Sequence, residues 1–406
     1  MSEVNTVPFG DDMIGRRIAH ARKLRKLTQR ELAELVPCSK SLIAQVEGGH
    51  KPATPSLIGA VARALRVQVT ELTGQPYRGR TADTDRIHAT IPEIREALVY
   101  WDITPELDVP PRSVSDLRAA VDRATALRQA ARYVELGTML PAVIKELTVH
   151  AHTIGASREA EVYSLLASAY SAADSMAYKL GYLDLFHIAV ERMAWAAGRS
   201  DDPLLPPVAD VRRSMAFVAS GAYGGGLTLL SRTRESLEAD LSDDQAVLSV
   251  YGTLHLRAAI LAARDSRTGD AWEHMAQAGD VAARVRHDTP DYGLLFGPSN
   301  TAIHEVAVAI ELGDADEAIR RGAGLELPPS LSAERTSHHF IDLSRAWLWQ
   351  RKPEKALDCV LRAEQIAAQR TRYHPMARET IARLLDTQRR VPTRLRGVAR
   401  RMGIAA

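Results

Sequence analysis

Apolar residues recur at helical spacing along almost the whole chain, and the alternation that marks a half-buried strand is almost absent. The segment 13–26 is typical, with one apolar face formed by Ile14, Ile18, Ala21 and Leu24. At 406 residues the chain is too long for one core, since single domains hold roughly 100–200 residues. The sequence therefore predicts an all-α protein of two or three domains.

Residues 11–74 divide into five short predicted helices. Thr28 is a favourable N-cap, and Glu31, three residues later, completes a capping-box pattern. Ser39 caps the next helix after a short turn. The expected helices cover residues 13–26, 29–36, 40–47, 56–65 and 69–72.

Charge is unevenly distributed between this segment and the rest of the chain. The whole chain holds 52 basic and 50 acidic residues, and this net charge of +2 is no argument for nucleic-acid binding. Residues 11–74 hold eleven basic and six acidic residues, a local surplus of five. A small basic module on a near-neutral body indicates a phosphate-binding head with a separate regulatory body.

Residues 75–112 change character, with prolines and a glycine interspersed among charges, which is typical of a linker. Within this segment, Ile94, Leu98 and Trp101 predict one short helix over 92–101 that docks on one of the domains. A linker of this length would leave the N-terminal head free of contact with the rest of the chain. In a dimer, we therefore expect the C-terminal domain to set the spacing between the two heads.

Residues 113–406 repeat a loose pattern of helix, short turn and helix. Small residues at the predicted helix crossings allow close packing, and each hairpin needs a neighbour to bury its apolar face. We interpret this segment as a tetratricopeptide-like (TPR-like) α-solenoid of roughly six or seven hairpins. The alternative is an irregular helical bundle.

The order and spacing of about sixty N-terminal residues resemble the Cro/C1-type (XRE-family) helix-turn-helix. Pro37 stands where the family usually has glycine, which leaves the geometry of that turn open. The resemblance implies a structural role for Glu47 within the domain. The residues that carry it are Gln29-Arg30-Glu31-Leu32-Ala33, Ser39 to Gly49, Pro52, Pro55-Ser56-Leu57 and Ala62-Arg63-Ala64-Leu65, with Ile18, Arg22 and Leu27 upstream.

The predicted helix 40–47 packs its apolar positions on the preceding helix, which leaves an open face formed by Ser39, Lys40, Ser41, Ala44 and Gln45. Such a helix fits the major groove of DNA. Lys40 suits the acceptors of guanine, Gln45 suits adenine and Ala44 suits a thymine methyl, while Ser41 suits base edges or phosphate. The alternative for each residue is a solvated surface side chain.

Other residues of the head are predicted to contact the phosphate backbone. Gln29 begins its helix, where the family resemblance implies contacts with a phosphate and with a partner side chain. The backbone amides at that helix end also attract phosphate. Arg16, Arg22 and Lys51 are predicted to neutralise phosphates, which positions a protein on DNA without reading its sequence. A role as plain surface residues is an equal alternative for these three.

The sequence lacks the Walker loop and the GxGxxG, HExxH and GxSxG motifs. Cys38 and Cys359, the two cysteines, lie far apart in sequence, which excludes a disulfide framework or a cysteine-rich zinc site. We therefore expect no enzyme activity, no cofactor and no bound metal. No apolar run reaches the roughly 18 residues that span a bilayer. Because residues 1–12 are polar and do not resemble a secretory signal, we expect a cytoplasmic protein without membrane contact.

A loop with two aromatic residues interrupts the hairpin rhythm between residues 288 and 304. Asn300 and His304 are spaced to share one face of the next helix, and an Asn in a solenoid groove can hold a peptide backbone. The predicted ligand site comprises Tyr292, Phe296, Asn300 and His304. The alternative is a loop tucked into the core, with Asn300 capping a helix.

The overall architecture, an XRE-type head on a TPR-like body, resembles the peptide-responsive quorum regulators of Gram-positive bacteria and the large regulators of actinobacteria. The resemblance implies a homodimeric transcriptional regulator that binds double-stranded DNA at a palindromic operator and senses a small molecule or a peptide. The alternative is a protein-interaction hub, in which the solenoid binds a partner protein and the head tethers it to DNA. The operator, the effector and the sign of regulation do not follow from the sequence.

Overall fold

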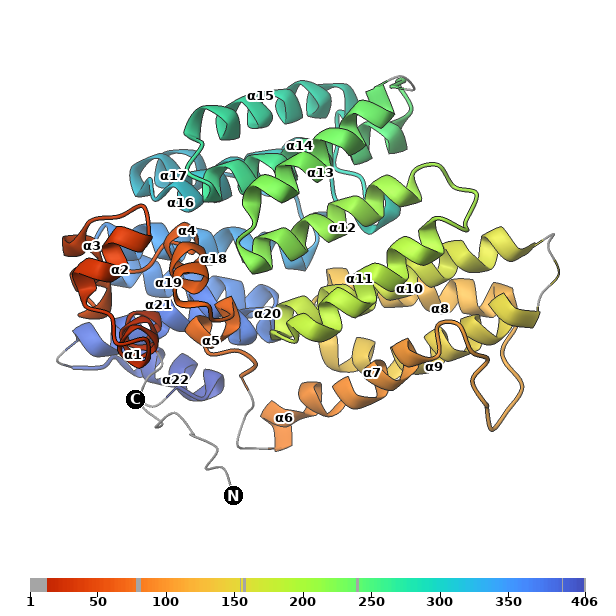
Figure 1. Ribbon diagram of the computed structural model, residues 1–406, viewed down its shortest axis with the longest axis horizontal. Helices are drawn as coiled ribbons and strands as arrows, with labels where there is room; N and C mark the ends of the chain where they lie inside the picture. Colours follow the sequence, from red (N-terminus) through yellow and green to blue (C-terminus); the bar gives the residue numbers. More distant parts are fainter. Residues whose placement is uncertain are drawn as a thin grey trace.

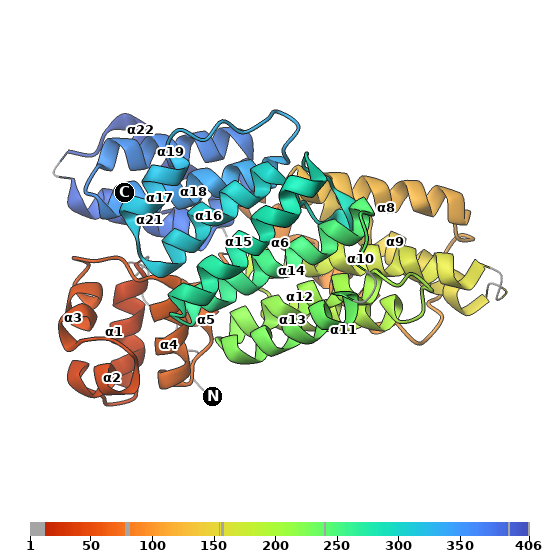
Figure 2. The ribbon, with the colours of Figure 1, turned by 90° about the horizontal axis from the view of Figure 1, so that it is seen from above.

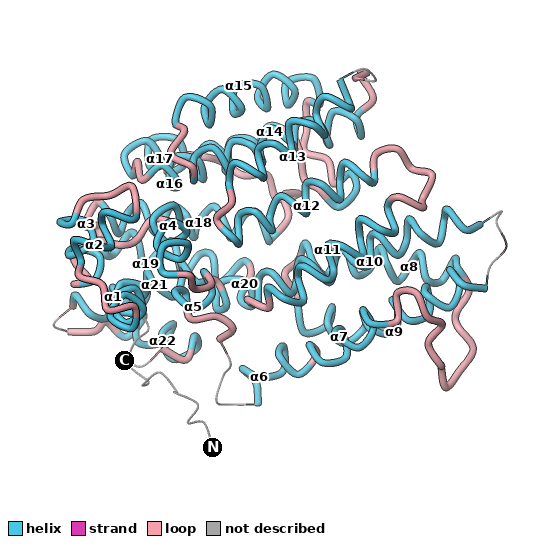
Figure 3. Tube along the Cα trace, in the orientation of Figure 1, coloured by secondary structure: helices cyan, strands magenta, loops and turns pink. Residues whose placement is uncertain are grey.

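The computed structural model describes residues 13–77, 82–153, 155, 158–238, 241–388 and 390–404. All regular structure in these ranges is helical (Figure 3), and strand-like pairing is limited to one isolated bridge between Thr289 and Phe296. The prediction of an all-α protein is confirmed.

The N-terminal head contains five short helices whose starts follow the predicted caps. The Thr28 backbone N–H donates to Glu31 Oε2 at 2.7 Å, and the Glu31 N–H donates to Thr28 Oγ1 at 3.2 Å. Ser39 Oγ accepts from the Leu42 N–H at 3.2 Å. The helices are α1 (Ile14–Leu24), α2 (Gln29–Leu35), α3 (Lys40–Glu47), α4 (Pro55–Leu65) and α5 (Val69–Thr73).

The predicted linker contains two helices, α6 (Ala82–Ala89) and α7 (Ile91–Val99), where the sequence predicted one. Both pack on α9 of the body, and α7 also contacts α11. Ile91, Ile94 and Leu98 are buried in the same apolar cluster as the first hairpins. This segment therefore forms the edge of the helical body as well as connecting it to the head.

The body is a series of antiparallel hairpins that stack side by side (Figure 1). Six hairpins follow the linker: α8 (Val114–Gln129) with α9 (Tyr133–Thr153), α10 (Glu159–Leu180) with α11 (Leu183–Ala197), α12 (Leu205–Ser220) with α13 (Tyr223–Glu238), α14 (Gln245–Arg264) with α15 (Thr268–Val285), α16 (Pro298–Leu312) with α17 (Ala315–Gly322), and α18 (Ala333–Trp349) with α19 (Pro353–Ile366). The chain ends with α20 (Ala368–Tyr373), α21 (Pro375–Thr387) and α22 (Thr393–Met402). This is the TPR-like α-solenoid that the hairpin pattern predicted.

The stack of hairpins curls until its two ends meet. Helix α18 contacts α8, and α20 contacts α10, so hairpins that are far apart in sequence lie together. The residues that line the interior of this superhelix come mainly from the first helices of the hairpins. One inner helix, α14, has the length and apolar composition of a membrane span, but 72% of its apolar window is buried within the protein.

The head is docked on the body, which differs from the expectation of freely hanging heads. Its apolar core is continuous with that of the C-terminal helices α19, α21 and α22. The Ile14 N–H donates to Glu379 Oε2 at 2.9 Å, and the Arg383 guanidinium donates to the carbonyls of Gly49 and Lys51 at 2.9 and 3.1 Å. This contact was not predictable from local sequence, because its two sides lie more than 300 residues apart.

Candidate DNA-binding surface and interior cavity

Helix α3 presents a polar face to solvent. Ile43 and Val46 are fully buried in the head core, which fixes the rotation of the helix and leaves Ser39, Lys40, Ser41 and Gln45 exposed and Ala44 half-buried. Gln45 Nε2 donates to Ser41 Oγ at 3.3 Å across one helical turn. Figure 2 shows α3 at the outer end of the molecule, away from the first hairpins of the body. The structure thus brings the five predicted base-reading residues together on an accessible helix.

A buried ion pair fixes the ends of α2 and α3 relative to α1. The Arg22 guanidinium donates to both Glu47 oxygens, at 2.7 and 2.9 Å, and its Nη1 donates to the Leu27 carbonyl at 2.5 Å. Gln29 Nε2 donates to the same carboxylate at 2.9 Å. The hydrogen bond that Arg22 donates to Glu47 raises the pKa of Arg22 above its ordinary value. Arg22, only 8% exposed, thus sits inside the domain, where it holds Gln29 and α3 in place.

The other two predicted phosphate-binding residues, Arg16 and Lys51, are exposed and lie where the head meets α21. Arg16 pairs with Asp386 at 3.5 Å, and the Lys51 carbonyl accepts from Arg383. Gln29, at the start of α2, is half-buried by its bond to Glu47. The structure therefore leaves the Arg16 and Lys51 side chains accessible beside the head–body contact.

The structure separates the four residues of the predicted ligand site. Phe296 is fully buried against Gly252, and the Tyr292 hydroxyl donates to the Asp202 carboxylate at 2.9 Å. The Asn300 amide nitrogen donates to the Leu295 carbonyl, so this side chain holds its own loop. Only His304 reaches an interior cavity, with its Nδ1 placed 2.8 Å from the Asn300 carbonyl oxygen.

That cavity has a volume of about 260 Å³ and lies between the head and the inner surface of the superhelix. Helices α4 and α5 of the head form one wall, through residues that include Ile58, Gly59 and Thr73. The remaining walls come mainly from the first helices of the hairpins. Eight cationic side chains line it: Arg128, Lys179, Arg212, Arg257, Arg264, Arg335, Arg345 and Arg370.

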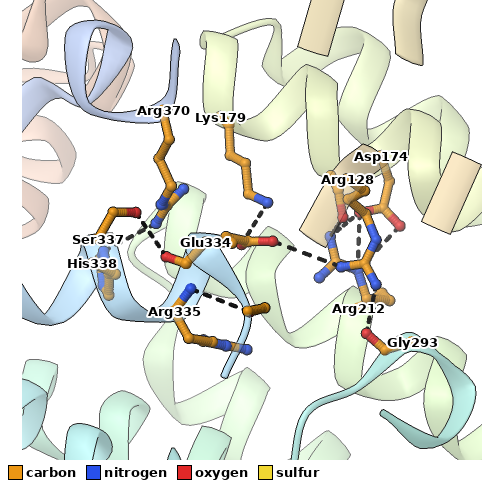
Figure 4. A network of polar contacts seen from close by, with 12 residues as sticks. Arg128, Asp174, Lys179, Arg212, Gly293, Glu334, Arg335, Ser337, His338 and Arg370 are labelled. Atoms are coloured by element: carbon orange, nitrogen blue, oxygen red, sulfur yellow. Dashed lines mark hydrogen bonds and ion pairs between the residues drawn. The ribbon is translucent and has the colours of Figure 1, made fainter. Parts of the chain in front are cut away.

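Acidic residues pair with some of these cations (Figure 4). Glu334 lies 2.5 Å from Lys179 Nζ and 3.9 Å from Arg128 Nη1, while the fully buried Asp174 accepts from Arg212 Nε at 2.9 Å. Burial alone raises the pKa of Glu334, but Lys179, Arg370 and Arg128 hold that pKa well below its ordinary value. Burial and the positive charges of Arg370 and Arg128 lower the pKa of Lys179 to about 7. Their effect is larger than that of Glu334, which raises this pKa.

Sequence reasoning missed this cavity because its cations come from six different helices. One signal was present: Arg257 interrupts an otherwise apolar stretch of α14 from Leu256 to Ala263. Among the described residues, no group of three or more His, Cys, Asp or Glu side chains is placed to hold a metal ion.

The comparisons with known proteins agree on the head. A family model described as "Helix-turn-helix domain" matches residues 14–73. The immunity repressor protein of Bacillus phage phi105 is 42% identical over 62 residues, which cover 15% of this chain and 43% of that protein. The matched region thus spans less than half of the relative's length. Residues 14–73 are a helix-turn-helix domain, and the recognition of a Cro/C1-type head is confirmed.

Two solved structures match most of the chain at low similarity. PlcR of Bacillus thuringiensis, in complex with the peptide PapR7 and DNA, covers 87% of this chain and 94% of its own, with 13% identity and a TM-score of 0.33. ComR of S. thermophilus, in complex with DNA and its signalling peptide ComS, covers 87% and 93%, with 10% identity and a TM-score of 0.21. These TM-scores are too low to establish a common arrangement of the helices.

Proposed function

We propose that this protein is a sequence-specific, DNA-binding transcriptional regulator whose helical body controls the head in response to an effector. The observation that carries this proposal is the exposed polar face of α3 in a matched helix-turn-helix domain. This function is binding rather than catalysis. A regulator of this kind acts where the DNA is, which we propose is the cytoplasm.

Each residue on α3 suits a particular contact in the major groove. Lys40 donates to guanine O6 or N7, Gln45 pairs with adenine N6 and N7, and Ala44 packs on a thymine methyl. Ser39 and Ser41 donate to base edges or phosphate. These contacts turn the solvent-exposed face of α3 into the element that reads sequence.

The phosphate contacts come from the rim of the same surface. The start of α2 offers backbone N–H groups and Gln29, while Arg16 and Lys51 supply exposed positive charge. Arg22 donates to Glu47, and we propose that it supports this surface by holding Gln29 and α3 in place. Binding should therefore weaken steeply with salt, because each neutralised phosphate releases counterions.

We propose that the protein binds as a homodimer to a palindromic operator. One head offers few base contacts, and a second head in the next major groove doubles them. Half-sites then lie about 34 Å apart, or a multiple of that distance. Since the head is bonded to α21 through Arg383, the body determines how the two heads are presented.

The test is selection of binding sites from random DNA by the full-length protein, followed by affinity measurements at matched salt. Lys40→Ala and Gln45→Ala should each weaken operator binding by about 1–3 kcal/mol. The control is Arg123→Ala, which removes an exposed cation from α8 at the far end of the molecule. Unchanged operator affinity in the Lys40→Ala, Gln45→Ala double variant would show that α3 does not read the DNA.

An interior cavity of about 260 Å³ between head and body supports a small effector over the interaction hub considered from sequence, because a partner protein binds a much larger outer surface. Light scattering tests the dimer: a monomer both free and on DNA contradicts it.

A further inference from the structure

The interior cavity has a large excess of positive charge on its lining. Eight cationic side chains line it, against three carboxylates, those of Glu311, Glu334 and Asp342. Adding Asp174, which bonds Arg212 from behind the wall, brings the acidic count to four. Half of the positive charge therefore lacks a matching carboxylate, although unpaired charge in a protein interior is strongly unfavourable.

Two of the cations show this deficit directly. The buried Nε of Arg257 has no hydrogen-bond partner, and among the described residues neither the Arg257 nor the Arg335 guanidinium forms an ion pair. Burial, Arg335 and Arg212 lower the pKa of Arg257 to about 9, as expected for a cation surrounded by like charge. Arg257 in particular lies on an apolar stretch of α14, where nothing in the fold itself requires a charge.

Other donors on the cavity wall are also unsatisfied. Arg345, only 5% exposed, pairs with Asp342 through Nη1 at 3.3 Å and leaves its buried Nη2 without an acceptor. Arg370 Nη2 lies 3.0 Å from His338 Nδ1, and the buried Nε of Arg370 has no acceptor. Buried donors without acceptors are rare in folded proteins and call for an explanation.

We propose that the cavity binds a small organic oxyanion, a phosphate ester or a di- or tricarboxylate, through Arg257, Arg335 and Arg370. Planar guanidinium groups bind both phosphate and carboxylate through paired hydrogen bonds. A volume of about 260 Å³ lies just below the usual range for drug-sized ligands, so the ligand is a small metabolite-sized molecule.

Apolar and aromatic residues of the same lining suit an uncharged portion of such a molecule. Tyr223, Val218, Leu294 and Ile58 present apolar or aromatic surface to the same space. Burial and the nearby arginines keep the pKa of His304 well below its ordinary value, so its imidazole is neutral and does not add to the charge. The ligand is thus expected to combine its negative charge with an apolar portion.

The cavity also connects the ligand to the head. Arg264 pairs with Glu311 at 2.8 Å on the cavity wall, while its own carbonyl accepts from Ser56 Oγ of α4 at 2.7 Å. Gly59 of α4 lies against the Tyr223 hydroxyl, and Arg63 donates to the Gly221 carbonyl. A ligand that draws these side chains inward changes how α4 is held, and by linkage DNA binding changes ligand affinity by the same factor.

The regulatory consequence rests on the proposed function, whereas anion binding itself does not. The experiment uses the full-length protein at constant ionic strength, with pyrophosphate and citrate as probes and sodium chloride as the reference. Thermal unfolding should shift upward by at least about 3 °C with one or both probes and not with chloride. A response to pyrophosphate alone identifies a phosphoryl ligand, and a response to citrate alone identifies a polycarboxylate.

The diagnostic variant is Arg257→Met, which keeps an unbranched apolar stem in place of the arginine stem and removes the guanidinium whose buried Nε has no partner. It should fold at least as stably as the wild type without anion and should lose the probe-induced shift. Arg232→Met, which removes an exposed cation from α13, is the control and should keep the full shift. If the variant proves unstable, Arg335→Met serves as the second test.

Equal shifts with chloride and both probes, or an undiminished shift in both cavity variants, would overturn the proposal. Operator affinity, measured separately, distinguishes the two hypotheses. Anion binding without operator binding refutes the proposed function alone, whereas operator binding without an anion response refutes this inference alone. With both present, the probe should change operator affinity in the wild type and not in Arg257→Met.

Discussion

The Arg22–Glu47 ion pair allows a sharp test of what holds the DNA-binding head together. Its side chains are only 10% and 5% exposed, and its carboxylate also accepts from Gln29. Replacing Glu47 with alanine leaves the buried guanidinium with the Leu27 carbonyl as its remaining acceptor. Breaking a buried pair in this way costs about 3–5 kcal/mol, because an uncompensated charge stays in the interior.

The same domain provides a matched control. Arg30 and Glu34 form an ion pair on α2 at 3.1 Å, but their side chains are 80% and 62% exposed. Glu34→Ala therefore breaks an ion pair of the same chemistry that is exposed to solvent. Such a pair contributes only about 0.3–0.5 kcal/mol to folding stability. The two substitutions differ mainly in burial, so their contrast isolates its effect.

Native-state hydrogen exchange of the full-length protein measures the difference, through peptides from α1 to α3. A loss of 3–5 kcal/mol accelerates exchange by roughly one hundred to a few thousand fold, and a loss below 0.5 kcal/mol by about twofold. Glu47→Ala should also lose operator binding, since Gln29 and the end of α3 lose their anchor. If the exchange rates of these peptides in Glu47→Ala stay within threefold of those in Glu34→Ala, the buried ion pair does not stabilise the head.

Two further predictions concern the body. A methyl group at Gly252 would lie 2.0 Å from the Phe296 ring, so Gly252→Ala should lower the melting temperature and cost about 1–3 kcal/mol of folding stability. The control is Gly279→Ala, whose methyl group meets nothing within 4 Å and should raise folding stability by up to about 1 kcal/mol. Equal melting temperatures of the two variants would contradict this prediction. Burial raises the pKa of Cys359 to about 12, so in a Cys38→Ser background its thiolate fraction at pH 8 is roughly a thousandth of an ordinary thiol's. Iodoacetamide should modify it far more slowly in native than in unfolded protein, and similar rates would refute the assignment.

Local signals were sufficient to predict the head from sequence. Thr28 with Glu31 and the cap at Ser39 act within four residues, and helical periodicity marks the buried faces. The exposed polar face of α3 followed from the same pattern, because Ile43 and Val46 determine which side is buried. The role of Arg22 did not follow, since its partner lies 25 residues away.

In the body, periodicity and small residues predicted hairpins and their stacking, because each hairpin mainly contacts its neighbours in sequence. The loop around Tyr292 and Asn300 broke that rhythm, but from sequence alone a loop that serves a ligand and a loop that bonds to itself look the same. The structure shows that Asn300 bonds to Leu295 and that only His304 reaches the cavity.

The sequence by itself determined the helices, the helix-turn-helix head and the repeat pattern, since each depends on contacts between residues close in the chain. Only the tertiary structure decided the docking of the head and the composition of the cavity. Arg128 and Arg370 lie 242 positions apart in the numbering, yet both line one space of about 260 Å³. The physical reason is that small rotations between successive hairpins accumulate into a closed superhelix. Where that superhelix closes depends on the sum of many packing angles, which no local segment of sequence contains.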